Sequence, residues 1–481
     1  MKNLTLILLA SIFLINSAFT QAPDTLWTHT YNITYVDWGY CVQQTSDGGF
    51  VATGYTENQI GNGDIFLLKT DANGNTSWTK TWGTNWGEFG EDVKQTQDGG
   101  YIIVGGGSYQ NSFGVWLLKT DSNGDTVWTK HIGQYAREEW GYSLDKTSDG
   151  GYIIVGTTSL WGSGDIFLIK TTGSGDTLWT KTLGGTNREV GYSVQQTSDG
   201  GYIITGYTFS FGAGESDLWL VKTDVGGNLI WDKTYGGNGI ERGHSVQQTL
   251  DGGYIITGIT SSFSAGLEDG WLIKTDGNGD SLWTKTYGGV DTDWLVSLDQ
   301  TNDGGYVLAG ETYSFGVNSG DAWLIKTNGN GDTLWTKTFG GIIDDLGEYV
   351  QQTSDGGYIL VGASSSFSSN NQKDIWLIRV KPDISDINPD QLPTNNFQLG
   401  QNFPNPFNPI TKIKYQISEL SFVTLKVFGV LGNESTIIVN EETPSGSYEV
   451  EFNAATLPSG VYFYQLRAGK YIETKKMLLI K

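Results

Sequence analysis

The chain has 481 residues and a formal net charge of −23, with 68 glycines and 13% aromatic residues. The aromatic content excludes a disordered chain, and a charged content of only 17% excludes a coiled coil. Three histidines and one cysteine exclude an internal disulfide and a zinc site built from Cys and His, and the acidic charge argues against nucleic acid as a partner.

The first 22 residues are typical of a secretory signal peptide. Lys2 precedes an apolar run from Leu4 to Phe19, and small residues follow up to Ala22. The alternative is a membrane anchor, but the run is shorter than the roughly 20 apolar residues that span a bilayer. We therefore expect residues 1–22 to be removed, and the mature chain to be exported and to have no transmembrane segment.

Seven copies of one unit follow the signal peptide. An Asp-Gly-Gly turn followed by an aromatic residue recurs at steps of 50 to 52 residues. The turn begins at Asp47, Asp98, Asp149, Asp199, Asp251, Asp303 and Asp355. A period of this length indicates a repeat architecture in which each copy is one supersecondary unit.

Each copy reads as four strands joined by hairpin turns. In the Asp-Gly-Gly turn a glycine supplies the positive φ of a tight hairpin and the aspartate closes the turn with its side chain. The two middle strands, such as YIITGYT and DLWLVKT, are apolar on both faces and must be covered on both sides. Four antiparallel strands in about 52 residues predict one propeller blade per copy.

The two ends of the repeat region predict a closed ring. The chain begins with a lone last-type strand, DTLWTHT (24–30), and the seventh copy stops after Val380 without that strand. We therefore predict an all-β fold, a seven-bladed β-propeller over residues 23–381 closed by the N-terminal strand. Its repeats resemble the S-D-G-G-Y-I-I propeller repeats of large surface proteins in certain Gram-negative bacteria. That resemblance implies the fold and carries no catalytic residues.

A linker and a second domain complete the chain. Residues 382–396 are rich in Pro, Asp and Asn, which is typical of an extended linker. The composition then changes, because the last 91 residues carry 8 Lys or Arg against 7 Asp or Glu, whereas the rest is strongly acidic. Short strand-like runs separated by turns predict a small immunoglobulin-like β-sandwich over residues 397–481.

Three motifs in this last domain occur in a fixed order. They are QNFPNPFNP (401–409), LPSGVYFYQL (457–466) and the terminal KKMLLIK (475–481). In these motifs the domain resembles the type A C-terminal sorting domain of the type IX secretion system. The resemblance implies the type IX machinery as a partner and a location outside a Gram-negative cell, secreted or on its outer surface. A plain immunoglobulin-like spacer is the alternative.

One carboxylate stands ten residues before the turn aspartate in every copy. These residues are Asp37, Glu88, Glu139, Glu189, Glu241, Asp293 and Asp345. If the strand ending in Gln-Gln-Thr is innermost, they form an acidic ring at the mouth of the central channel that binds a ligand or a cation such as calcium. The alternative is structural, since a feature present in every blade meets a need that every blade has, such as accepting backbone N–H bonds.

Tryptophans break the sevenfold pattern and are the second set of candidate binding residues. They are Trp38, Trp86, Trp140, Trp161 and Trp294. Exposed tryptophan beside carboxylates is suited to stacking on sugar rings, and aromatic residues also anchor protein interfaces. The alternative is ordinary blade packing. We therefore expect a possible glycan or surface-protein ligand at the acidic, tryptophan-bearing mouth.

No motif indicates catalysis or a resident cofactor. The Asp-Xaa-Asn-Gly-Asp loops depart from the EF-hand spacing, so we interpret them as hairpin turns. His244, assigned to a loop, is the one candidate proton carrier, and no nucleophile motif accompanies it. We expect a noncatalytic binding or scaffold module without cofactor. The alternatives are a propeller enzyme that acts on polysaccharide through ring carboxylates, and a structural surface component without a specific ligand.

Overall fold

The computed structural model describes most of the chain in two compact units, residues 1–386 and 387–481. The described residues are 21–84, 87–109, 112–133, 139–159, 163–317, 319–368, 371–383, 398–400, 402, 405–417, 421–429, 433–443, 446–469 and 471–480. Residues 1–20, most of the predicted linker, Trp86 and Trp161 lie outside them. The boundary between the units falls inside the predicted linker.

Within the described part of residues 25–380, hydrogen bonding forms seven four-stranded antiparallel sheets, one for each repeat. Six of them are consecutive in the chain: β2 (Val36–Gln44), β3 (Phe50–Glu57), β4 (Gly63–Thr70), β5 (Thr76–Trp82); β6 (Phe89–Gln95), β7 (Tyr101–Tyr109), β8 (Ser112–Thr120), β9 (Thr126–Ile132); β10 (Trp140–Lys146), β11 (Tyr152–Thr157), β12 (Ile166–Thr171), β13 (Thr177–Leu183); β14 (Glu189–Gln196), β15 (Tyr202–Thr208), β16 (Asp217–Thr223), β17 (Leu229–Tyr235); β18 (Glu241–Gln248), β19 (Tyr254–Thr260), β20 (Asp269–Thr275), β21 (Ser281–Tyr287); β22 (Asp293–Gln300), β23 (Tyr306–Thr312), β24 (Asp321–Thr327), β25 (Thr333–Phe339).

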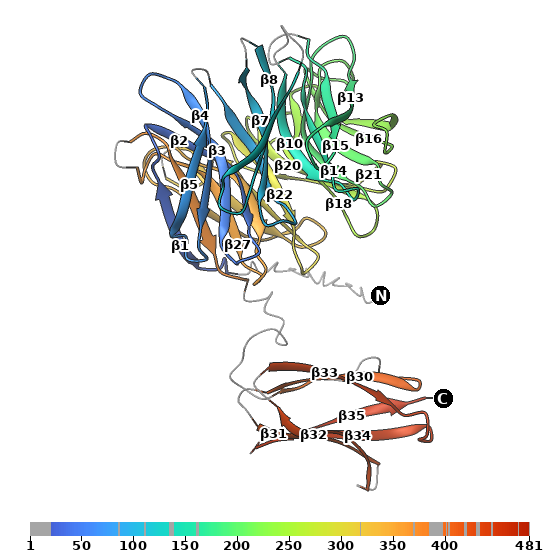
Figure 1. The fold of residues 1–481 in the computed structure, drawn as a ribbon. Helices are drawn as coiled ribbons and strands as arrows, with labels where there is room; N and C mark the ends of the chain where they lie inside the picture. Colours follow the sequence, from blue (N-terminus) through green and yellow to red (C-terminus); the bar gives the residue numbers. More distant parts are fainter. Residues whose placement is uncertain are drawn as a thin grey trace, which may run out of the picture. The chain divides into compact units, whose positions relative to one another are not determined.

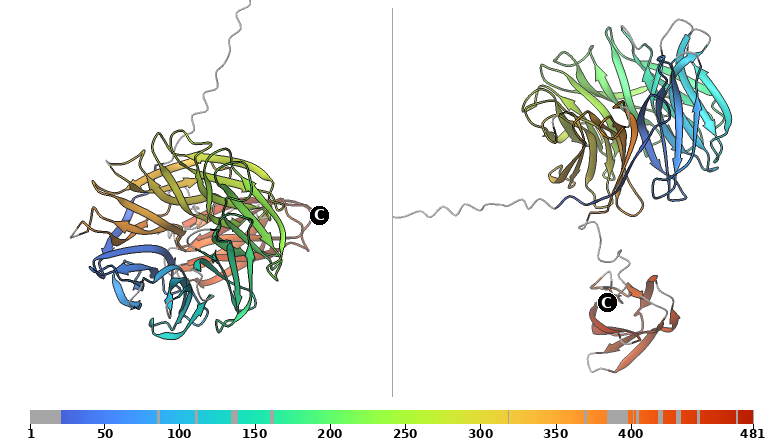
Figure 2. Two further views of the ribbon diagram at one scale, coloured as in Figure 1. Left: turned by 90° about the horizontal axis from the view of Figure 1, so that it is seen from above. Right: turned by 90° about the vertical axis from the view of Figure 1, so that its left-hand side faces the viewer.

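The seventh sheet joins the two ends of the repeat region, as the sequence predicts. It consists of β26 (Asp345–Gln352), β27 (Tyr358–Ser364), β28 (Asp374–Val380) and, as its outer strand, β1 (Thr25–Tyr31). Each sheet packs against the next, and the first packs against the seventh, so the sheets form a closed ring around a common centre (Figures 1 and 2). Closure leaves no sheet face without a neighbour.

The order of strands within a sheet runs from the centre outward. The first strand of each sheet (β2, β6, β10, β14, β18, β22 and β26) contacts the first strands of both neighbours, so these seven strands surround the axis. This confirms that the Gln-Gln-Thr strand is innermost. The two middle strands are buried along their whole length, for example in β15 and β16, because adjacent sheets cover both faces.

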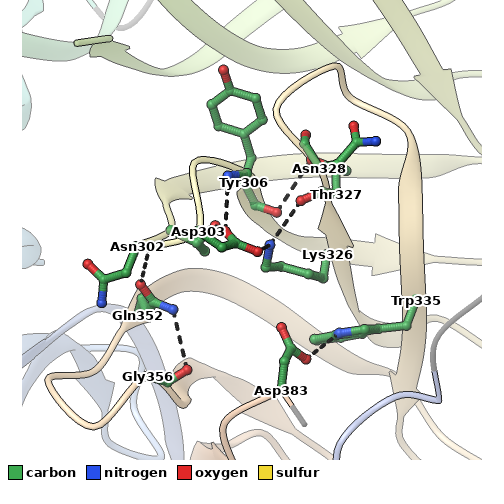
Figure 3. A network of polar contacts seen from close by, with 12 residues as sticks. Asn302, Asp303, Tyr306, Lys326, Thr327, Asn328, Trp335, Gln352, Gly356 and Asp383 are labelled. Atoms are coloured by element: carbon green, nitrogen blue, oxygen red, sulfur yellow. Dashed lines mark hydrogen bonds and ion pairs between the residues drawn. The ribbon is translucent and has the colours of Figure 1, made fainter. Parts of the chain in front are cut away.

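The Asp-Gly-Gly turn closes as predicted and also holds a buried cation. Its first glycine has a φ of about 81° to 84° in every repeat, a conformation that favours glycine. In the repeat of Figure 3, Asp303 Oδ1 accepts the N–H of Gly305, and Asp303 Oδ2 lies 2.7 Å from Nζ of the fully buried Lys326. The equivalent pairs are Lys69–Asp47, Lys119–Asp98, Lys170–Asp149, Lys222–Asp199, Lys274–Asp251 and Arg379–Asp355.

Polar side chains join each blade to the next. Gln352 on β26 accepts the N–H of Asn302 from the preceding blade at 2.8 Å and donates to the carbonyl of Gly356 at 3.3 Å (Figure 3). At the outer edge the bonds are exposed, as between Lys285 of β21 and Asp332 of the next blade at 2.9 Å. The same two kinds of contact recur around the ring.

The C-terminal unit has two sheets that share one hydrophobic core. Its strands are β29 (Gln398–Leu399), β30 (Ile410–Ile417), β31 (Ser421–Gly429), β32 (Glu434–Thr443), β33 (Gly446–Asn453), β34 (Gly460–Ala468) and β35 (Tyr471–Leu479). The sheet orders are β29-β30-β33 and β32-β31-β34-β35. Residues such as Ile413, Leu425 and Tyr464 pack between them. A β-sandwich is therefore confirmed for this unit.

Candidate binding channel

Every inner strand carries a β-bulge at the same position. In each, the pairing register skips one residue, which is left outside the ladder and turned toward the axis. The skipped residues are Tyr40, Glu91, Tyr142, Tyr192, His244, Val296 and Glu348. In six of the seven strands the preceding residue is glycine, because the strand lies against the preceding blade: a Cβ on Gly191 would lie 2.5 Å from Val155 Cγ2.

These seven residues and the residues that follow them line a cavity of about 310 Å³ at the centre of the ring. The second set is Cys41, Asp92, Ser143, Ser193, Ser245, Ser297 and Tyr349. Hydroxyl, carboxyl and imidazole groups therefore face the cavity together with aromatic rings. We call this cavity the central channel. Its volume is at the lower end of the range for small-molecule sites.

Two glutamates of the central channel are held by tryptophans of the neighbouring blades. Trp140 Nε1 donates to Glu91 Oε1 at 2.9 Å, and Trp38 Nε1 donates to Glu348 Oε1 at 3.0 Å. Burial raises the pKa of each glutamate to about 7, against the opposing effect of the indole hydrogen bond. Each carboxyl group is therefore oriented by an indole N–H and has a pKa well above that of an exposed glutamate.

A run of aromatic rings connects the two glutamates. Tyr40, on the strand between them, lies 6.1 Å from Trp38 and 6.1 Å from Tyr55, measured between ring centroids. Phe89 continues the run, 4.8 Å from Tyr55 and 5.1 Å from Trp140. At the Glu348 end, Lys373 Nζ lies 3.6 Å from the centroid of the Trp38 ring. Tyr40 lines the cavity together with the two glutamates, and the other rings of this run are not among the lining residues.

The other side of the channel is aromatic and carries no acid among the bulge residues. Tyr192 lies 5.0 Å from Tyr142 and 5.1 Å from His244, ring centroid to centroid. His244 lies in strand β18, not in a loop as the sequence analysis assumed. Burial, and the nearby Arg242, lower the pKa of His244 to about 4, so its imidazole is neutral at pH 7. It is therefore unsuited to the role of proton carrier near neutral pH.

The predicted ring of carboxylates is not at the surface of this channel. Its seven members are buried, with 0 to 2% exposed area. Backbone N–H groups of the loops between blades donate to six of them, namely Asp37, Glu88, Glu189, Glu241, Asp293 and Asp345. Glu241, for example, accepts the N–H of Gly237 and of Ser262 and the hydroxyl of Thr260, each at 2.9 Å. Burial leaves them inaccessible to a ligand in the channel, so the expected open acidic ring does not match the structure. The structural alternative, acceptance of backbone N–H bonds, does.

The predicted tryptophans separate into two places. Trp38 and Trp140 are not among the residues that line the cavity, but their indole N–H groups hold Glu348 and Glu91, which are. Trp294 does not join them: its Nε1 donates to Glu268 Oε2 at 2.7 Å, and it lines a separate groove of about 590 Å³ with Tyr313 and Phe315. Trp86 and Trp161 lie outside the described residues.

Sequence reasoning missed Glu91 and Glu348, although a signal was present. Each bulge residue stands seven positions before the turn aspartate of its repeat. At that position the copies read Tyr, Glu, Tyr, Tyr, His, Val and Glu, whereas the flanking positions keep their residue type in most copies. Variation between repeats of one chain therefore marks the channel better than the shared carboxylate does.

The Asp-Xaa-Asn-Gly-Asp loops are hairpin turns, as predicted. Asp121 Oδ1 accepts the N–H of Asn123 at 2.8 Å and of Asp125 at 2.9 Å, and these two bonds close the turn. In the part of the chain that the structure describes, no group of three or more His, Cys, Asp or Glu side chains is arranged to hold a metal. The described residues also include no helix long and apolar enough to cross a membrane.

Residues 401–481 match the family model described as "Secretion system C-terminal sorting domain". Over 195 residues the chain is 24% identical to the regulatory protein FlaEY of Caulobacter vibrioides, which covers 35% of this chain and 20% of that protein. The chain thus spans about a fifth of the length of this curated relative.

Among solved structures, one similar chain is PorZ, a surface component of the type IX secretion system of Porphyromonas gingivalis. The TM-score is 0.42 at 12% identity, over 96% of this chain and 60% of PorZ. The propeller domain of the Trilobed protease from Pyrococcus furiosus gives a TM-score of 0.40 at 9% identity, over 72% of this chain and 94% of that chain. The fold assignment rests on strand pairing, and the route of export rests on the C-terminal family match. This chain is therefore an exported β-propeller protein with a type IX secretion sorting domain at its C-terminus, and its place is the cell surface or the extracellular space.

Proposed function

We propose that the propeller is a noncatalytic binding module and that the central channel is its site for the end of a glycan chain. The observation that carries this proposal is the loss of sevenfold symmetry at the bulge positions. Contacts that hold the ring together recur from blade to blade, whereas the residues facing the channel differ. A ligand has no sevenfold symmetry, so a site for it is expected where the repeats diverge.

The chemistry of the channel supports a sugar ligand. Tyr40, Tyr142 and Tyr192 line the channel with aromatic rings of the kind that stack on a pyranose, and the serine and tyrosine hydroxyls offer donors and acceptors. Glu91 and Glu348 are fixed by indole N–H groups, so binding requires little loss of side-chain freedom. The carboxyl groups accept hydrogen bonds when ionised and also donate one when protonated.

The test is to titrate the chain from Pro23 to Lys481 with each member of a panel of oligosaccharides. Binding is detected by the change in tryptophan fluorescence. We expect one or more members to bind, and Tyr40→Ala to weaken that binding at least tenfold because it removes a ring face from the channel. Trp294→Ala is the matched control, since Trp294 lines the separate groove, and it is expected to leave the affinity unchanged. Equal losses in both variants, or no binding by any oligosaccharide, would contradict the proposal.

A polysaccharide-cleaving enzyme is the second candidate, favoured by the paired glutamates of the channel with pKa values of about 7. A carboxyl group of this kind can act as an acid near neutral pH. The predicted ring carboxylates are unsuited to that role because they are buried and hydrogen-bonded. Release of new reducing ends from any bound polysaccharide, abolished by both Glu91→Gln and Glu348→Gln, would favour the enzyme over the binding module. If the chain neither binds nor cleaves any glycan, the remaining candidate is a structural surface component without a specific ligand.

A further inference from the structure

Two arginines without a protein partner lie beside the aromatic side of the central channel. Arg188 immediately precedes β14 and Arg242 lies in β18, and no other repeat has an arginine at either equivalent position. In the part of the chain that the structure describes, neither guanidinium has a hydrogen-bond acceptor or an ion-pair partner. The Nε atom of each is enclosed, whereas the outer amino groups are not, so each side chain is held at its base and open at its tip.

Arg242 reaches over the preceding blade toward the channel. Its Cζ lies 5.2 Å from the centroid of the Tyr207 ring, and that ring lies 5.8 Å from the ring of Tyr192, which lines the channel. Arg242 occupies the position from which Trp38 and Trp140, in their own blades, contact the bulge residue of the preceding blade. For Arg242 the bulge residue of the preceding blade is Tyr192.

The charges of both arginines act on residues that line the channel. Burial raises the pKa of Tyr142 and of Tyr192, and the positive charge of Arg188 opposes that rise. Burial lowers the pKa of His244, and the charge of Arg242 lowers it further. Although neither arginine lines the cavity itself, this side of the channel is therefore electropositive, in a chain whose net charge is −23.

The acidic residues next to these arginines in the chain do not neutralise them. Glu189 accepts the N–H of Gly185 at 2.9 Å, and Glu241 accepts the N–H of Gly237 at 2.9 Å. Both carboxylates are fully buried under their loops, and among the described residues neither forms an ion pair. A partly buried cation without a counter-charge is unfavourable, so a ligand that brings an anionic group would supply the missing partner.

We propose that the sugar bound in the central channel carries a carboxylate, and that Arg242 and Arg188 bind this group. The inference rests on the proposed glycan-binding function of the channel. The planar fork of a guanidinium matches the two oxygens of a carboxylate, and charge-assisted hydrogen bonds of this kind are stronger than neutral ones. Uronic acids carry such a group on a pyranose ring. The ligand class is therefore an acidic glycan, whose ring hydroxyls remain available to Glu91 and Glu348.

The test compares oligosaccharides that end in a uronic acid with their methyl esters, which keep the same rings and lose the charge. Trigalacturonate and a disaccharide ending in glucuronate, each in acid and ester form, are titrated into the chain from Pro23 to Lys481 at physiological ionic strength. We expect at least one acid form to bind about tenfold more tightly than its ester, or better.

Two contrary results have different meanings. Equal affinities of acid and ester, or binding of neutral glycans alone, would overturn the inference about the carboxylate and leave the glycan-binding proposal in place. Failure of every sugar to bind, acidic or neutral, would overturn both. This comparison uses the unchanged protein, so it does not depend on whether any variant folds.

Single variants test whether the two arginines hold the carboxylate. Arg242→Met and Arg188→Met should each weaken binding of the acid form about tenfold and leave that of the ester unchanged, because only the ionic contact is removed. Lys181→Met is the matched control: it removes one positive charge from the outer strand β13, where Lys181 Nζ donates to Asn228 at 3.1 Å, and it should change neither affinity. An unchanged preference for the acid in both arginine variants, or an equal loss in Lys181→Met, would overturn the assignment.

Discussion

The structural contacts of the propeller repeat from blade to blade, whereas the residues that line the central channel differ from blade to blade. The structural contacts repeat at the same places: a buried base beside the turn aspartate within a blade, and, between blades, a buried acid under the loop and an exposed ion pair at the rim. In the channel, equivalent positions carry Tyr, Glu, His or Val. Repetition thus marks what holds the propeller together, and divergence marks where it is free to acquire a specific ligand.

The largest expected effect comes from breaking a repeated contact in the interior. Asp303→Ala leaves the fully buried Lys326 without its carboxylate, so we expect a loss of about 3 to 5 kcal/mol in the free energy of unfolding of the propeller. Urea unfolding followed by tryptophan fluorescence measures it. Replacing both partners, as in Asp303→Leu with Lys326→Met, should recover part of the loss. A loss below 1 kcal/mol in the single variant would show that the pair is not needed by the scaffold.

An intermediate effect, with a distinctive pH dependence, is expected in the channel. The pKa of Glu348 is raised from 4.5 to about 7. Between pH 4.5 and about 7 the folded state therefore retains a proton that the unfolded state has released. Stability falls as pH rises through this window. Glu348→Gln should therefore be more stable than the unchanged protein at pH 8, by about 1 kcal/mol after screening by channel water, with the difference vanishing below about pH 4.5. Thermal unfolding at both pH values measures it.

The same substitution in a scaffold carboxylate provides the contrast. Glu241 accepts three hydrogen bonds from the loops, so Glu241→Gln should lower stability at pH 8, where Glu348→Gln raises it. Stabilisation in both variants, or in neither, would remove the distinction between channel and scaffold.

The smallest effect is expected at the rim. Asp332→Ala removes the partner of Lys285, and both side chains are largely exposed, so the free energy of unfolding should change much less than in Asp303→Ala. The change should disappear at high salt, since exposed ion pairs are screened. A salt-independent loss as large as that of Asp303→Ala would show that the outer contacts carry as much of the fold as the inner ones.

The channel was only partly predictable. Trp38 and Trp140 were identified as residues that break the repeat, and in the structure they hold two glutamates of the channel without lining the cavity themselves. Their partners Glu91 and Glu348 were missed because a β-bulge, which depends on how neighbouring strands are packed, decides which residue of the inner strand faces the axis. The shared carboxylates were expected at an open mouth, but they are buried under the loops between blades, where they accept hydrogen bonds from backbone N–H groups.

The repeats, their four strands, the closure of the ring by β1 and the sorting domain at the C-terminus could all be predicted from the sequence. These features depend on local patterns: hydrophobic runs, glycine turns with positive φ, and motifs in a fixed order. Only the tertiary structure decided which polar groups are buried as partners of the backbone and which face a cavity. That decision arises from contacts between residues about 50 positions apart, such as Trp140 with Glu91, whose pairing no local pattern specifies.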